Sequence, residues 1–133
     1  MDNIMDAVKE WHKVAENDLM SAKHLLTLYP KPLEIIAYHC QQCAEKYLKS
    51  YLVFNDEDVI KTHDLKKLCN LCTVFEKKFS TLENQCGVLV TYITDTRYPP
   101  KLDLTDNDVK KAIEYAEEIR DFVLEAIGEN TPD

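Results

Sequence analysis

Polar side chains that could form a ligand site recur along one edge of the segment 33–54. Residues three or four positions apart share one side of a helix. The members of this edge are His39, Gln42, Lys46 and Lys49, with Gln41 and Glu45 beside them. Glutamine amides can hydrogen-bond a neighbouring helix or the edge of a base. The alternative interpretation is a solvated face, on which Glu45 and Lys49 pair one helical turn apart.

Three additional residues, all later in the chain, could complete such a site. Arg97 would supply a fixed cation and Tyr98 a stacking ring, which are the groups that an anionic purine nucleotide needs. His63 is a third candidate. Its neighbour Asp64 is instead expected to cap a helix. His24 is expected to have no chemical role. If these elements converge, they form a pocket for a nucleotide or for an acidic loop of a partner. The ligand-binding candidates are therefore His39, Gln41, Gln42, Glu45, Lys46, His63, Arg97 and Tyr98.

Four cysteines form a CxxC…CxxC pattern, which is the ligand set of a structural zinc ion. The pairs are Cys40 with Cys43 and Cys69 with Cys72. Both pairs lie inside continuous helical patterns without a nearby glycine, and a thiol in reducing cytosol packs as a small hydrophobic group. We therefore expect buried thiols and no metal, and we keep a zinc-stabilised helical adaptor as an alternative.

The spacing of apolar residues predicts five helices that would position these side chains. They cover about residues 4–29, 33–54, 65–79, 80–93 and 105–127, and the acid-rich stretch 55–62 is expected to be a loop. The expected fold is all-α, an up-down antiparallel bundle of four long helices plus one short helix. We expect a single domain over residues 1–133, with its core at about 4–128.

Local signals mark where several of these helices begin and end. Ser80 with Glu83 matches a capping box for the fourth helix, and Thr105 is the expected cap of the fifth. Gly128 is a plausible terminating residue. Gly87, inside the fourth helix, is expected to mark a close approach between two helices.

Composition limits the classes of function. The chain has 133 residues, of which 45% are hydrophobic and 30% charged, and no apolar run reaches the ~20 residues of a membrane-spanning helix. No signal peptide is recognised, so we expect a cytoplasmic protein without a membrane partner. The net charge is −8, and residues 103–133 hold ten acids against three bases. This surface should repel phosphates, so we expect no broad nucleic-acid binding.

Three motifs, in order, resemble the HEPN family of helical domains that accompany nucleotidyltransferases. The first is His39-x-Gln41-Gln42-x-x-Glu45-Lys46-x-Leu48-Lys49. The second is His63-Asp64-Leu65 and the third Arg97-Tyr98-Pro99. The first predicted helix also fits, and the resemblance spans roughly residues 8–127.

The resemblance implies a helical bundle, a homodimer, and a role as partner of a minimal nucleotidyltransferase in a two-component, toxin–antitoxin-like system. Some members of this family are ribonucleases that use an arginine followed four to six residues later by a histidine. Here the arginines are Arg97 and Arg120, and all four histidines precede both. That mechanism is therefore absent, so we expect no catalytic residues and no cofactor. A ribonuclease with an atypical site, such as Arg97 with His63, remains an alternative.

Overall fold

The computed structural model describes residues 2–93 and 103–128, and every regular element in these ranges is helical. The long helices are α1 (Asp2–Leu25), α2 (Leu33–Phe54) and α5 (Asp106–Ile127). The short ones are α3 (Leu65–Thr73) and α4 (Glu83–Leu89), with 3₁₀ segments η1 (Lys77–Leu82) and η2 (Val90–Ile93). The predicted all-α class is confirmed. None of the described helices is long and apolar enough to span a membrane.

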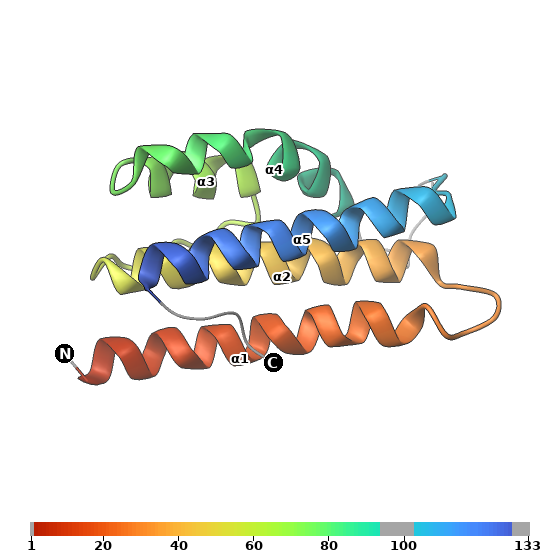
Figure 1. Ribbon diagram of the computed structural model, residues 1–133, viewed down its shortest axis with the longest axis horizontal. Coiled ribbons are helices and arrows are strands. Elements are labelled where there is room, and N and C mark those ends of the chain that lie inside the picture. Colours follow the sequence, from red (N-terminus) through yellow and green to blue (C-terminus); the bar gives the residue numbers. More distant parts are fainter. Residues whose placement is uncertain (1, 94–102, 129–133) are drawn as a thin grey trace.

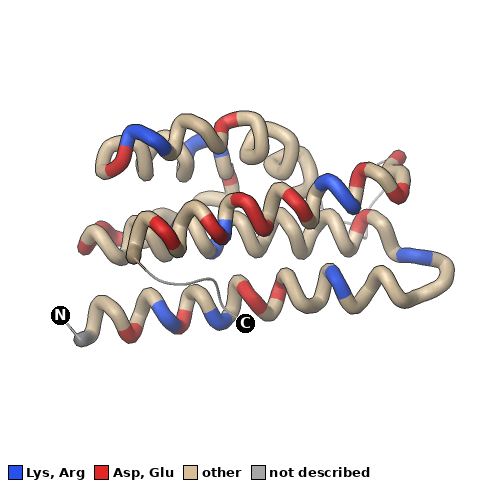
Figure 2. Tube along the Cα trace, in the orientation of Figure 1, with Lys and Arg blue, Asp and Glu red and all other residues tan. Residues whose placement is uncertain are grey.

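The bundle is built around α2, which contacts α1, α3, α4 and α5. Figure 1 shows α1 and α2 running in opposite directions, α4 running back above them, and α5 returning in the direction of α2. A helix covered on several sides needs apolar or small residues on several sides. Accordingly α2 buries two thiols, Cys40 and Cys43, together with Ala37, Ala44 and Tyr47. Acidic residues recur along α5 (Figure 2).

Several predicted helix ends are confirmed. The Asp64 side chain accepts hydrogen bonds from the backbone amides of Lys66 and Lys67 at the start of α3. Thr105 forms a capping box with Asp108 at the start of α5. Gly128 ends α5 with φ of 89°, in the left-handed region that glycine tolerates.

The fourth helix differs from the prediction. The predicted third helix, 65–79, ends early at Thr73, and residues 77–93 fold as η1, α4 and η2, so the α-helical part of the fourth is only seven residues long. The predicted Ser80–Glu83 capping box is wrong, because Ser80 lies inside η1 and α4 begins at Glu83 without a side-chain cap. A 3₁₀ turn places residues three apart on one side, and this spacing buries both Phe79 and Leu82.

The expectation for Gly87 is also wrong. A β-carbon added there would meet no described atom within 4 Å. No close approach of helices therefore requires a glycine at this position.

Candidate functional site

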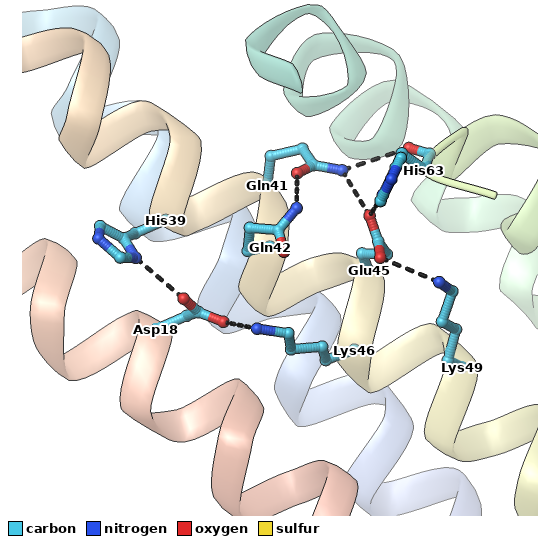
Figure 3. Close-up of polar contacts among 8 residues, drawn as sticks. All are labelled: Asp18, His39, Gln41, Gln42, Glu45, Lys46, Lys49 and His63. Carbon is cyan, nitrogen blue, oxygen red and sulfur yellow. Dashed lines mark hydrogen bonds and ion pairs between the residues drawn. The ribbon is translucent and has the colours of Figure 1, made fainter. Parts of the chain in front are cut away.

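The polar edge of α2 is organised around two carboxylates, one of which comes from another helix. Asp18 of α1 contacts two residues of α2 (Figure 3). Its Oδ1 lies 2.9 Å from Nδ1 of His39, and its Oδ2 accepts a hydrogen bond from Nζ of Lys46. Asp18 was not among the predicted site residues. It is three residues from Ala15 and four from Ala22, both of which are buried. An acid on the apolar side of α1 was the feature of the sequence that could have indicated its role.

Glu45 is the centre of the second group and is only 4% exposed. Its Oε1 lies 2.9 Å from Nδ1 of His63 and 3.1 Å from Nε2 of Gln41, and its Oε2 accepts from Nζ of Lys49 at 3.0 Å. Gln41 is fully buried, donates to the carbonyl oxygen of His63, and accepts from Nε2 of Gln42 at 2.7 Å. The pairing of Glu45 with Lys49 is therefore real, but both side chains are buried. The interpretation of this edge as a solvated face is wrong for Gln41, Glu45 and Lys49.

Each carboxylate fixes one imidazole. A carboxylate can only accept, so Nδ1 of His39 and of His63 carries the hydrogen and Nε2 is the ring's remaining polar atom. The His63 side chain is 65% exposed, whereas His39 and Lys46 are partly buried. The two groups thus present histidines in fixed orientations while their acids stay inside.

An open groove of about 540 Å³ adjoins His39. Its other lining residues all belong to α1 and are Asn17, Met20, Ser21, His24 and Leu25. His24, for which no chemistry was predicted, therefore lies in the same groove as a candidate site residue.

Arg120 is held within the bundle by acids. Its Nη1 donates to Glu16 at 3.2 Å and its Nε to Asp121 at 2.9 Å. Glu16 also accepts from the hydroxyl of the fully buried Tyr47 at 2.5 Å. Burial, with this hydrogen bond, raises the pKa of Tyr47 above its usual value. Arg120 thus links α5 to α1 and, through Glu16, to α2.

Arg97 and Tyr98 lie outside the described residues. The predicted convergence of these two residues with the edge of α2 therefore remains a prediction.

All five cysteines are buried, and none forms a disulfide. Among the described residues, no three histidine, cysteine or acidic side chains group so as to hold a metal ion. Cys69 instead donates to the carbonyl of Phe79 and Cys72 to that of Leu48. The geometry gives no support to the zinc-stabilised adaptor.

Comparison with known proteins identifies the class to which this bundle belongs. The model of the HEPN domain family matches residues 8–127, so the chain belongs to the HEPN domain family. It is also similar to the crystal structure of ST0689, an archaeal HEPN homologue, with 25% sequence identity and a TM-score of 0.71. That match covers 90% of this chain and 97% of the other. A search of curated proteins finds no match.

Proposed function

We propose that this protein is a cytoplasmic HEPN-type binding module that binds a nucleotide, serves as the partner subunit of a minimal nucleotidyltransferase in a two-component system, or does both. The observation that carries the proposal is the His63 imidazole, exposed to solvent and held at Nδ1 by the buried carboxylate of Glu45. Gln42, Lys46 and His39 follow along the same edge. Groups whose orientation is already fixed lose little entropy when a ligand binds them.

The charge of this edge is compatible with an anionic ligand even though the chain as a whole is acidic. Asp18 is matched by Lys46 and Glu45 by Lys49, so the two acids leave no excess negative charge. The remaining groups are amides, which can donate hydrogen bonds to phosphate oxygens, and imidazoles, which can donate from Nε2 when the ring is protonated. The acidic excess is concentrated in residues 103–133 instead.

The test is a thermal-shift series with a panel of nucleotides. A nucleotide at 100 times its Kd should stabilise the protein by about 2.7 kcal/mol. His63→Ala, Gln42→Ala and Arg97→Ala should each reduce this shift, whereas Lys67→Ala, an exposed residue one turn beyond Asp64, should not. If no nucleotide shifts the melting temperature of the parent protein, the nucleotide site is excluded.

The partner role is tested separately. Co-expression with a minimal nucleotidyltransferase encoded beside this chain should give one co-purifying complex. HEPN domains often dimerise, and we propose a homodimer here, which sedimentation equilibrium of the isolated chain would show directly. A monomeric chain that does not bind the nucleotidyltransferase would contradict this part of the proposal.

A further inference from the structure

A second candidate site lies at the C-terminal end of α2 and shares no residue with the polar edge. It is an open groove of about 260 Å³ between the end of α2, the following loop and α3. Its apolar lining residues are Leu52, Ile60, Leu71, Val74 and Phe75, and its acidic ones are Glu57 and Asp58.

Two of the apolar residues that line this groove are open to water. Val74 is 76% exposed and Phe75 40%, and both immediately follow α3. These are two of the eight large hydrophobic side chains that are exposed among the described residues, and they line one groove. Exposed apolar side chains at a groove are typical of a surface that binds a partner.

The acidic residues of the groove are held in place by the backbone. The amide of Asp56 donates to the carbonyl of Val53 at 2.9 Å, and that of Glu57 donates to Leu52 at 3.0 Å. Asp56 has φ of 59°, a left-handed conformation that aspartate tolerates better than most residues. The chain therefore turns sharply after α2, and this turn fixes the backbone from which Glu57 and Asp58 project into the groove.

Glu57 and Asp58 have no ion-pair partner within the part of the chain that the structure describes, and no lysine or arginine lines the groove. An occupant that buried the apolar residues would bring its flanking groups close to these two carboxylates. Lysine or arginine would pair with them there, whereas an acidic flank would be repelled.

We propose that this groove binds an amphipathic helix of a partner protein, with apolar side chains facing Val74 and Phe75 and basic side chains facing Glu57 and Asp58. A helix is the form we propose because the groove lies between the end of α2 and α3, and an amphipathic helix is a common occupant of an apolar groove. The charged residues would then set the orientation of the bound helix, and the apolar residues would supply most of its affinity. The proposal does not depend on nucleotide binding at the edge of α2.

The test uses labelled helical peptides of leucine and lysine, and of leucine and glutamate, titrated into the full chain. The leucine–lysine peptide should bind, and the leucine–glutamate peptide should not. Val74→Ser combined with Phe75→Ser should weaken binding roughly tenfold or more, because buried apolar anchors carry most of the affinity. Glu57→Lys combined with Asp58→Lys should also weaken it and should reduce its dependence on salt.

Matched controls separate this groove from general attraction to an acidic protein. Asp6→Lys with Glu10→Lys makes the same change of charge on exposed positions of α1, and Met20→Ser removes an exposed apolar side chain there. Neither should alter binding. Equal binding by the groove variants and the parent would overturn the proposal, as would equal binding of the two peptides. Loss of a dimer in the Val74→Ser, Phe75→Ser variant would show instead that a second copy of the chain covers the groove.

Discussion

Nδ1 of His63 lies 2.9 Å from Oε1 of Glu45, although the two residues are 18 positions apart and only the acid is buried. This contact ties the segment before α3 to the middle of α2. The same carboxylate holds Nζ of Lys49, whose side chain is 8% exposed. A charge in that position depends on its partner, because an unpaired buried ion is strongly disfavoured.

Glu45→Gln should therefore destabilise the protein by about 2–4 kcal/mol, since the shape is kept and Lys49 loses its counter-charge. Urea denaturation, with the midpoint and the slope both fitted, measures the change. Glu45→Gln combined with Lys49→Met should recover much of the loss, because no buried charge is then left alone. If the single variant unfolds at the same urea concentration as the parent, Glu45 and Lys49 do not form a buried ion pair in solution.

The hydroxyl of Tyr47 should contribute measurably to stability through Glu16. Removing it with Tyr47→Phe leaves the packing intact and deletes a partly buried hydrogen bond to a charged acceptor, which should lower the free energy of unfolding by about 1.5–3 kcal/mol. The matched control is Tyr115→Phe, whose hydroxyl accepts only a long bond from Asn84 at the surface. Thermal denaturation should show a clear decrease for the first variant and almost none for the second. Equal melting temperatures for the two variants would contradict the buried network.

Several helix ends follow from local features of the sequence, although the first and third helices end at Leu25 and Thr73, earlier than predicted. Apolar spacing after Pro30 and Pro32 predicts α2 with its observed bounds, and Thr105 and Asp64 cap α5 and α3 as predicted. These signals are local, because a helix needs only neighbouring residues to define its buried side and its first amides.

Contacts between helices could not be predicted in the same way. The contacts of Asp18 with His39 and Lys46 depend on how α1 is rotated against α2. The spacing of residues within one helix does not determine this rotation. The spacing predicts helices over 65–79 and 80–93, because apolar residues three apart, such as Phe79 and Leu82, suit either an α-helix or a 3₁₀ turn over short stretches, and residues 77–82 fold as the latter.

A β-carbon added at Gly87 in α4 would meet no described atom within 4 Å, so the lack of a side chain has no packing role there. Gly87→Ala should raise the free energy of unfolding by up to ~1 kcal/mol, since alanine restricts the unfolded chain and favours the helix. Gly128→Ala is the opposite control, because φ of 89° strains any residue with a side chain. A destabilised Gly87→Ala variant, measured by urea unfolding, would show that something contacts this face of α4 in solution.

The buried cysteines should react slowly with thiol reagents as long as the protein is folded. Burial, reinforced by Glu117 and Asp18, raises the pKa of Cys40 to about 12, and burial also raises the pKa of Cys43 and of Cys72. The thiolate is the reactive form, so at pH 8 these side chains are both protonated and inaccessible. A colorimetric disulfide reagent should modify all five cysteines rapidly in urea and these three only slowly without it. Rapid modification of Cys40 in the folded protein would contradict its burial.

The same raised pKa values make stability depend on pH on the alkaline side. In the unfolded chain a thiol loses its proton near pH 9, whereas Cys40 in the folded protein keeps its proton until about pH 12. Between these values the unfolded state binds fewer protons, so the stabilisation is complete below pH 9 and is lost as the pH rises toward 12. Each such thiol should lower the free energy of unfolding by roughly 1 kcal/mol per pH unit in this window. Urea midpoints measured at pH 7, 8 and 10 should be nearly equal for the first two and lower for the third, and Cys40→Ala should make the decrease less steep.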